Sequence, residues 1–164
     1  MKLKSLLLAL LILTGCASAP PIPPELQYVP PSGPGTSLST IMGSQEDSTF
    51  FDDFTAYIIG VDGKRVMSGR KAWSTPLPIQ AGQRNITVMF QRGRSKAQAD
   101  LVLQAVAGEQ YQVRFSSDAQ LFGANTYCDF WIVNMSTQTA VTEIKRGVIG
   151  GVWQTTVPVF IPTH

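Results

Sequence analysis

Apolar and polar residues alternate along the central part of the chain, and this alternation predicts β-strands. Every second residue is apolar in residues 86–90, 99–105 and 111–115, so each segment has one face suited to a core. Residues 54–61 and 128–133 are rich in aromatic and β-branched residues, which favour strands. Sheets that stack such faces against each other form a core without any helix.

Turn signals separate these segments. Asp62-Gly63 joins residues 54–61 to residues 64–67, and this dipeptide between two strand-like segments is a strong signal for a two-residue hairpin turn. Glycine-containing stretches and polar stretches predict the other reversals of the chain. These further turns are expected at residues 91–95, 107–109 and 134–139.

About seven strands and no amphipathic helix are predicted between residues 38 and 146, which is typical of a sandwich or a small barrel. The last strand is expected at residues 140–145, and Pro76 and Pro78 predict an irregular connection after the first hairpin. The fold class expected is therefore all-β, a single antiparallel β-sandwich of the transthyretin/Ig-like kind.

The start of the chain has the organisation of a targeting segment. Lys2 and Lys4 precede an apolar run at residues 6–13, which is too short to span a membrane but suits a signal peptide. The run continues into Leu13-Thr14-Gly15-Cys16, which resembles the lipobox of bacterial lipoproteins. The resemblance implies that residues 1–15 are removed, that the Cys16 thiol carries a diacylglycerol, and that the new N-terminus is acylated. Ala17 after the cysteine is similar to the class sorted to the outer membrane.

The composition changes on both sides of the predicted domain. Residues 16–37 hold seven of the 11 prolines and predict a lipid anchor followed by a disordered, Pro-rich tether that reaches up to about 60 Å. Residues 38–146 are the predicted β-sandwich domain. Residues 147–164 are apolar but contain Pro158 and Pro162, so they are interpreted as an edge strand or as a docking arm for a partner.

Three loose motifs resemble PEGA-type domains of bacterial envelope proteins. They are Val-Asp-Gly-Lys at residues 61–64, the strand entry at residues 78–88, and Ala-Gly-Glu-Gln-Tyr at residues 107–111. The chain departs from the family pattern at Ala81-Gly82, where Pro-Gly is usual, and at Asn85, near the usual histidine. The resemblance implies a transthyretin-like sandwich in an envelope setting and no catalytic residues.

Charge and cysteine content narrow the classes of partner. The formal net charge of +2 belongs to the targeting segment, because removing Lys2 and Lys4 from 13 basic residues leaves 11 against 11 acidic ones. A neutral mature protein has no long-range field to attract nucleic acid, which is excluded as a partner. If Cys16 carries lipid, Cys128 has no partner for an intramolecular disulfide, and it is interpreted as a buried thiol rather than a reactive one.

Candidate catalytic residues are few. His164, the last residue, is the only histidine, which argues against a Ser–His–Asp or Cys–His arrangement. Glu46, Asp47 and the pair Asp52-Asp53 are interpreted as solvated loop charges, with a calcium site as the alternative. The sequence thus predicts no enzyme, no catalytic residue, no metal and no cofactor, and Cys16 is the one modified site.

Two sets of surface residues suggest contacts. Basic residues flank the hairpins at residues 64–71 and 84–96, and they would form a basic rim if the two hairpin ends met. The usual role of such charges is to protect sheet edges. Five aromatic residues near turns are expected to cap an open end of the sandwich, with an exposed contact surface as the alternative: Phe50, Phe51, Trp73, Phe122 and Tyr127.

Together these features predict a non-enzymatic envelope lipoprotein. Cys16 would anchor it, most simply in the outer membrane of a Gram-negative bacterium and facing the periplasm, with the β-sandwich mediating protein contacts. One alternative is a structural subunit of a secretion or appendage complex that docks through residues 147–164. Another is a protein that binds or hydrolyses the cell wall.

Overall fold

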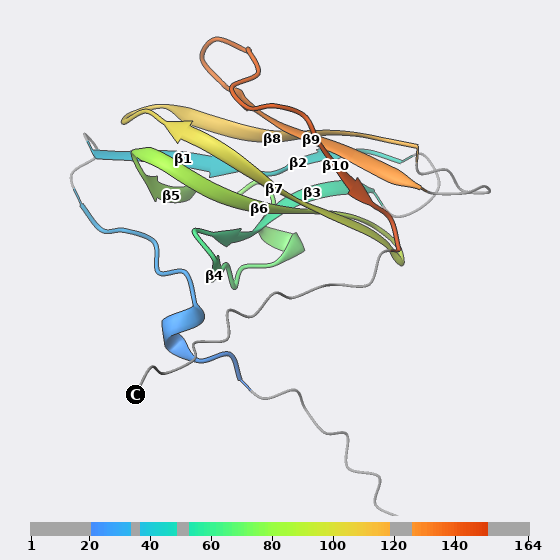
Figure 1. The fold of residues 1–164 in the computed structure, drawn as a ribbon, viewed down its shortest axis with the longest axis horizontal. Coiled ribbons are helices and arrows are strands. Elements are labelled where there is room, and N and C mark those ends of the chain that lie inside the picture. The colour runs from blue at the N-terminus through green and yellow to red at the C-terminus, as the bar shows by residue number, and fades with distance from the viewer. Residues whose placement is uncertain (1–20, 34–36, 49–52, 119–125, 151–164) are drawn as a thin grey trace, which may run out of the picture.

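A computed structural model of the chain describes residues 21–33, 37–48, 53–118 and 126–150, which form a β-sandwich (Figure 1). Short 3-10 helices lie in the connections. Along the chain the elements are η1 (Pro24–Leu26), β1 (Leu38–Met42), β2 (Ser44–Glu46), β3 (Phe54–Val61), β4 (Lys64–Arg65), η3 (Arg70–Ala72), β5 (Leu77–Gln80), β6 (Gly82–Arg92), β7 (Ser95–Ala105), β8 (Gln110–Ser117), β9 (Tyr127–Asn134) and β10 (Lys145–Val148).

The strands form two sheets that pack face to face. Sheet A has the order β2-β3-β6-β7, with β4 paired to β3, and sheet B has the order β10-β9-β8-β1-β5. Every pair of these strands is antiparallel except β1 and β8, which are parallel. The predicted all-β sandwich is confirmed. The expectation of about seven strands was too low, because the short strands β1, β2 and β5 lack a clear alternation.

The alternating segments form the centre of the sandwich as predicted. In the long hairpin of β6 and β7, Ile86 lies opposite Leu101 and Phe90 lies opposite Ala97, and these side chains are buried on the inner face. Sheet B contributes the inner residues of β8 and β9. The largest fully buried side chains of the described residues are Tyr111, Phe90, Phe130, Ile41, Ile79, Ile86, Leu101, Leu103, Ile132, Val61, Val88 and Val113.

The predicted hairpin turn after β3 is confirmed. Asp62 and Gly63 both have positive φ, 51° and 76°, as a type I′ turn requires. Asp62 adds a second interaction, because its carboxylate accepts a hydrogen bond from the backbone N–H of Asn85 at 2.9 Å. The short side chain of aspartate, which tolerates this backbone conformation, thus also ties the turn to β6.

Two expectations about strand positions were wrong. Pro78 lies within a strand, β5, because β5 is the edge strand of sheet B and needs no N–H donor at that position. The last strand is β10 at Lys145–Val148, not residues 140–145. After one bridge between Val133 and Ala140, the Thr142 hydroxyl accepts the hydrogen bond from the Ile132 N–H at 2.9 Å, so the side chain replaces a backbone partner and delays regular pairing.

The boundary expected between residues 146 and 147 falls inside β10. Gly147 and Val148 pair with Cys128 and Tyr127 of β9, so the beginning of the apolar tail is an edge strand of the domain. Residues 151–164 lie outside the described residues, and the docking arm stays a prediction for them. A truncation that tests it has to begin at residue 151, because removal of residues 147 and 148 would cut β10.

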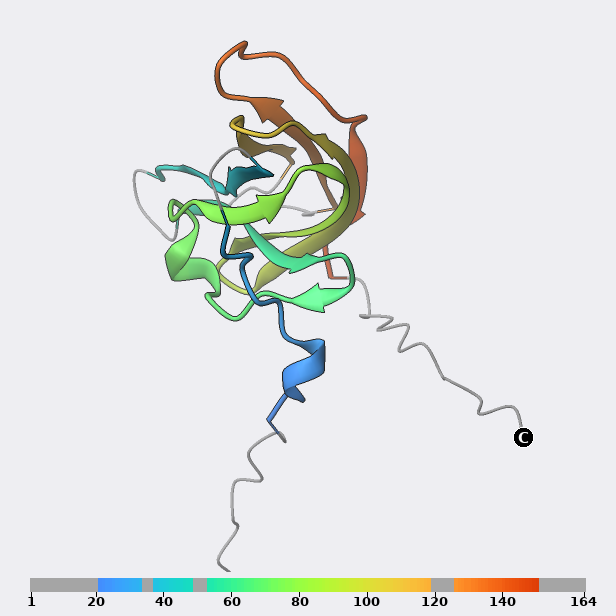
Figure 2. The same ribbon diagram turned by 90° about the vertical axis from the view of Figure 1, so that its left-hand side faces the viewer.

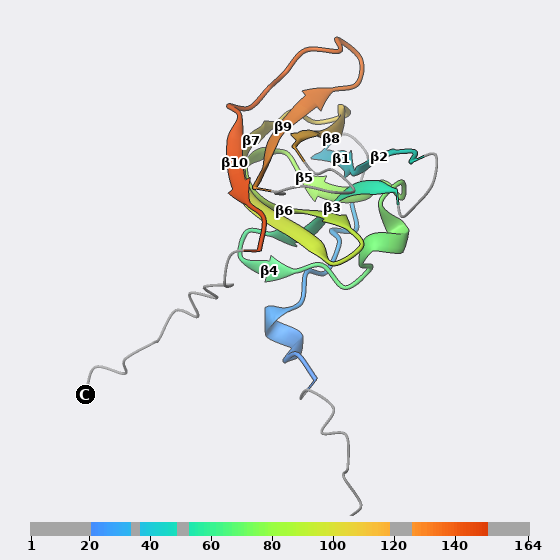
Figure 3. The same ribbon diagram turned by 90° about the vertical axis from the view of Figure 1, so that its right-hand side faces the viewer.

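The two sheets come together closely at two glycines. Gly43 lies where the chain passes from β1 in sheet B to β2 in sheet A. Gly147 of β10 lies so close to β7 that an added Cβ would be 2.5 Å from the Gln98 carbonyl oxygen. Figures 1 and 3 show β10 beside β7 at this corner. Both positions need glycine for close approach of backbones, not for a positive φ.

The Pro-rich segment differs most from expectation. Residues 16–37 were predicted to be a disordered tether, but part of this segment packs on the domain. Gln27 forms a parallel bridge with Arg65 of β4, and Tyr28 packs against the hydrophobic core. The physical reason is that packing against the core removes the large Tyr28 ring from water, which is favourable. The prediction of disorder considered only the prolines around Tyr28.

Candidate functional site

An N-terminal segment that follows Cys16 closely in the sequence is docked on one end of the domain. The Tyr28 N–H donates to the Arg65 carbonyl oxygen at 2.8 Å, and the Tyr28 hydroxyl donates to the Pro78 carbonyl oxygen at 2.8 Å. Desolvation, with a smaller contribution from the Asp62 charge, raises the pKa of Tyr28, so the phenol keeps its donor proton. Upstream, the Gln27 side-chain amide donates to the Ile22 carbonyl oxygen at 2.7 Å. These hydrogen bonds thus hold the backbone in place from Tyr28 back to Ile22.

Exposed apolar and basic side chains surround this docking point. Leu26 of η1 is 51% exposed and Met67, which follows β4, is 56% exposed. Lys64 and Arg65 of β4 are exposed as well. We call these four residues, Leu26, Lys64, Arg65 and Met67, the N-terminal face.

The N-terminal face and the connection between β9 and β10 lie at opposite ends of the molecule. In Figures 1, 2 and 3, η1 and β4 lie at the lower end, and the loop of residues 135–144 projects from the upper end. Ile144 in that loop is 64% exposed. The domain therefore has one end close to its N-terminal segment and one end remote from it.

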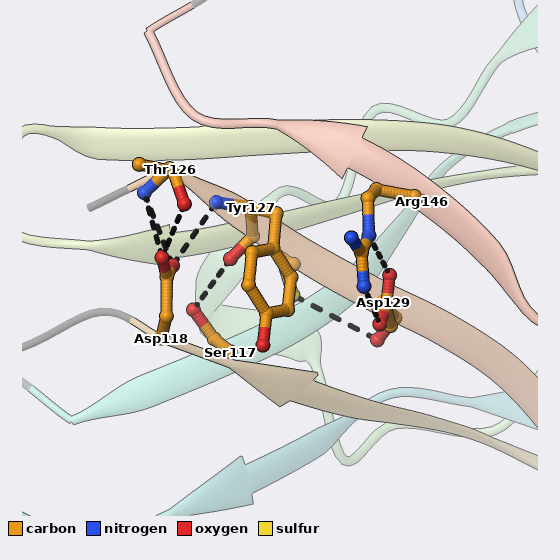
Figure 4. A network of polar contacts seen from close by, with 7 residues as sticks. Ser117, Asp118, Thr126, Tyr127, Asp129 and Arg146 are labelled. Carbon is orange, nitrogen blue, oxygen red and sulfur yellow. Dashed lines mark hydrogen bonds and ion pairs between the residues drawn. The ribbon is translucent and has the colours of Figure 1, made fainter. Parts of the chain in front are cut away.

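A second polar cluster lies where β8 ends and β9 begins (Figure 4). The Asp118 carboxylate accepts hydrogen bonds from the backbone N–H groups of Thr126 and Tyr127, each at 3.0 Å, and from the Thr126 hydroxyl. The Ser117 hydroxyl donates to the Tyr127 carbonyl oxygen at 3.0 Å. These bonds join the two strands at the base of the connection between them.

Arg146 connects β10 to the same region. Its guanidinium donates two hydrogen bonds of 2.7 Å to the Asp129 carboxylate, a bidentate geometry that adds directional specificity. It also lies over the Tyr127 ring, 4.0 Å from the ring centroid, which is a cation–π distance. Arg146 thus holds the edge strand β10 in register on β9.

The carboxylates of this cluster are suited to structure rather than to proton transfer. Hydrogen bonds from the Thr126 side chain, the Tyr127 N–H and the Thr126 N–H lower the pKa of Asp118. The Arg146 guanidinium beside Asp129 lowers the pKa of that carboxyl group. A general acid needs a raised pKa to hold a proton near neutral pH, so both groups are anionic acceptors under those conditions.

The lowered pKa of Asp118 predicts a pH-dependent stability. The folded pKa lies below the ordinary value of 3.8, so the contribution of Asp118 is complete above that value and is lost as pH falls through the folded pKa. The difference in unfolding free energy between wild type and Asp118→Asn is expected to be largest near neutral pH and to shrink well below pH 3.8. Urea unfolding at both pH values measures it. An equal difference at the two pH values would contradict this assignment.

Cys128 is buried, as the sequence analysis interpreted it. Its side chain belongs to the hydrophobic core, and it is a free thiol. Burial, followed by the charge of Asp129, raises the pKa of the thiol far above its usual range. Because the thiolate is the nucleophile, the raised pKa contradicts the alternative of a reactive thiol.

One of the carboxylates before β3, Asp53, is tied to β2 and to the residue range that follows it, whereas Glu46 and Asp47 are exposed. Asp53 accepts hydrogen bonds from the Gln45 side-chain amide at 2.6 Å and from the Ser48 N–H at 3.1 Å. Asp52 lies outside the described residues, and so the calcium alternative stays a prediction there. Across residues 21–33, 37–48, 53–118 and 126–150, no group of three or more His, Cys, Asp or Glu side chains is placed to hold a metal ion.

The two hairpin ends, whose meeting was the condition for a basic rim, lie apart. The turn after β3 lies beside Asn85 at the start of β6, whereas Thr55 near the start of β3 pairs with Gln91 near the end of β6. The two hairpin ends are thus separated along β3 by about 20 Å at the usual rise per residue. Arg84 pairs with Asp62 at 2.8 Å, while Arg92 lies over the Phe54 ring, 4.1 Å from its centroid.

The aromatic residues near turns have different roles. Trp73 is half-buried, and its carbonyl oxygen accepts the Gly43 N–H at 2.7 Å. Tyr127 is half-buried beneath Arg146. Phe50, Phe51 and Phe122 lie outside the described residues, so a shared aromatic cap stays a prediction. The aromatic residue that the sequence analysis missed is Tyr28, and its signal was a large apolar ring within an otherwise proline-rich stretch.

The fold and these surfaces define a β-sandwich with an ordered N-terminal segment. Comparison with protein-family models, with curated proteins and with solved structures finds no match for this chain. Within the described part of the chain, no helix is long and apolar enough to cross a membrane.

Proposed function

We propose that this protein is a non-enzymatic lipoprotein of the bacterial envelope, anchored through Cys16. The observation that carries the proposal is the sequence Leu13-Thr14-Gly15-Cys16 directly after a short apolar run. A short apolar run behind basic residues is the pattern of an exported protein. Two or more acyl chains on one residue provide stable membrane attachment.

The domain's chemistry supports a role in contacts rather than in turnover. Asp118 and Asp129 act as hydrogen-bond acceptors within the sandwich, and the Cys128 thiol is buried. The side chains that do reach solvent with apolar surface belong to loops and edges, as at Met67 and Ile144. Because these polar and thiol groups are engaged or buried within the sandwich, the protein is proposed to act by binding in the envelope, at the outer membrane and on the periplasmic side.

Replacement of the lipidated residue tests the anchor. Cys16→Ser is expected to lower the membrane-bound share of the protein at least on the order of tenfold, or to accumulate a precursor that retains residues 1–15, because the side chain can no longer accept the acyl chains. Membrane fractionation with mass spectrometry of the N-terminal peptide measures both effects. Cys128→Ala is the control, and its attachment is expected to equal that of wild type. A Cys16→Ser protein that is cleaved and still membrane-bound would refute the proposal.

A further inference from the structure

We propose that the N-terminal face, Leu26, Lys64, Arg65 and Met67, rests on the surface of the anionic phospholipid bilayer that holds the protein. This inference rests on the proposed lipid anchor at Cys16 and adds an orientation to it. A freely tethered domain would present all its sides to the membrane in turn. The docked segment instead allows one end of the domain to face the bilayer.

The chain between the proposed anchor and the docked segment is short. Gln27 is fixed on β4, and its side chain holds the Ile22 carbonyl group. Five residues lie between Cys16 and Ile22, and the six extended residue-to-residue steps span at most about 20 Å. The disordered tether predicted from sequence would have reached about 60 Å. The end of the domain that carries η1 and β4 therefore stays close to the bilayer.

The side chains of this end are basic and apolar. Lys64 and Arg65 are exposed on β4, and Leu26 and Met67 expose more than half of their surface beside them. Exposed basic residues are attracted to anionic headgroups, and apolar side chains gain by entering the interface. The acidic residues of this region are Glu25 on η1 and Asp62.

Those two carboxylates do not cancel the attraction. Asp62 is neutralised by its ion pair with Arg84 at 2.8 Å. Glu25 then remains against Lys64 and Arg65, and the local charge is positive. The loop between β9 and β10 projects from the opposite end (Figures 1 and 3) and is turned away from the membrane in this orientation. Ile144, the last residue before β10, is 64% exposed.

Site-specific probes on the lipidated full-length protein test the orientation. Met67→Cys and Ile144→Cys are each labelled with an environment-sensitive fluorophore, and the lipid-linked Cys16 and the buried Cys128 leave little background labelling. The proteins are incorporated into vesicles of phosphatidylethanolamine and phosphatidylglycerol that contain a spin-labelled quencher lipid. Only vesicles recovered by flotation are measured. The probe at position 67 is expected to be quenched severalfold more than the probe at position 144.

The outcomes separate the two proposals. Protein that does not float with the vesicles refutes the lipid anchor and the orientation with it. Protein that floats but shows equal quenching at positions 67 and 144 refutes the orientation alone. Strong quenching at position 67 that is the same in pure phosphatidylcholine vesicles would refute the role of anionic headgroups.

Charge and linker variants provide the remaining tests. Lys64→Glu with Arg65→Glu is expected to lower quenching at position 67 by about twofold or more, because each basic residue adds attraction to an anionic surface. The matched control is Arg94→Glu with Lys96→Glu, at the far end of β6 and β7, and it is expected to have no effect. Insertion of about 12 Gly/Ser residues after Ala19 is expected to lower the local concentration of the N-terminal face at the bilayer about fivefold. Quenching at position 67 is therefore expected to fall. Quenching at position 67 that is unchanged in both the Lys64/Arg65 charge variant and the insertion variant would overturn the inference.

Discussion

Gly43→Ala is expected to lower the free energy of unfolding by about 3 kcal/mol or more. A Cβ at this position would lie 2.1 Å from the Ala56 carbonyl oxygen and 3.1 Å from the Trp73 carbonyl oxygen. Both obstacles are backbone atoms, so no change of rotamer can relieve the overlap. The methyl group can fit only if β2 moves away from β3 or if the chain leaves sheet B earlier.

The position of Gly43 explains the size of this effect. Met42 pairs with Gln112 in sheet B, and Ser44 pairs with Ala56 in sheet A. One residue therefore carries the chain between the two sheets, and both of its polar groups are used: its N–H donates to Trp73, and its carbonyl oxygen accepts from the Gln112 side chain at 3.1 Å. A shift here breaks pairing in two sheets at once.

Equilibrium urea unfolding followed by tryptophan fluorescence measures the change. Gly33→Ala is the control, because an added Cβ there meets only the Ser37 hydroxyl at 3.7 Å, an ordinary contact distance. Its stability is expected to stay within about 0.5 kcal/mol of wild type. A Gly43→Ala protein of unchanged stability would show that the two sheets are not joined as closely as the structure describes.

Phe90→Ala is the second substitution with a large expected effect, a loss of about 3–5 kcal/mol of unfolding free energy. Phe90 is fully buried on β6. Its ring centroid lies 6.2 Å from that of Phe54 on β3 and 5.3 Å from that of Phe115 on β8. The ring therefore packs within sheet A and across to sheet B, and its removal leaves a cavity between the sheets.

A graded series makes this prediction specific. Phe90→Leu is expected to cost less than Phe90→Ala, because it retains part of the buried apolar volume. Val102→Ala is the control on the neighbouring strand β7, since Val102 is 55% exposed, and it is expected to change stability by about 0.5 kcal/mol or less. The same urea unfolding measurement applies. Equal losses for the alanine and leucine variants would argue against a cavity as the cause.

Local patterns predicted the centre of the fold well. The alternation at residues 86–90 and 111–115 placed β6 and β8 because the period of side-chain burial in a strand is a property of the strand itself. The turn at Asp62-Gly63 was predictable for a similar reason: positive φ at two successive residues restricts the residue types, so the sequence signal is local.

Contacts between distant residues account for the predictions that were wrong. Pro78 and Tyr28 are 50 residues apart in the chain, and nothing near either residue signals their contact. The delayed start of β10 depends on Thr142 meeting Ile132, a competition between a hydroxyl and a backbone partner. The proposed anchor is the opposite case, since its prediction depends on four consecutive residues ending at Cys16 and on no tertiary contact.

The amino-acid sequence alone therefore determined the β-rich class, the main hairpins, the buried Cys128 and the prediction of a lipid anchor. Each of these depends on residue type, short spacing or a two-residue periodicity. Only the tertiary structure decided that Gly43 carries the chain between the sheets and that β10 packs on β7. It also decided that Tyr28 fixes the N-terminal segment on the domain. These features arise from side chains and backbones that are remote in sequence, and they become defined only when both sheets bury their apolar faces together.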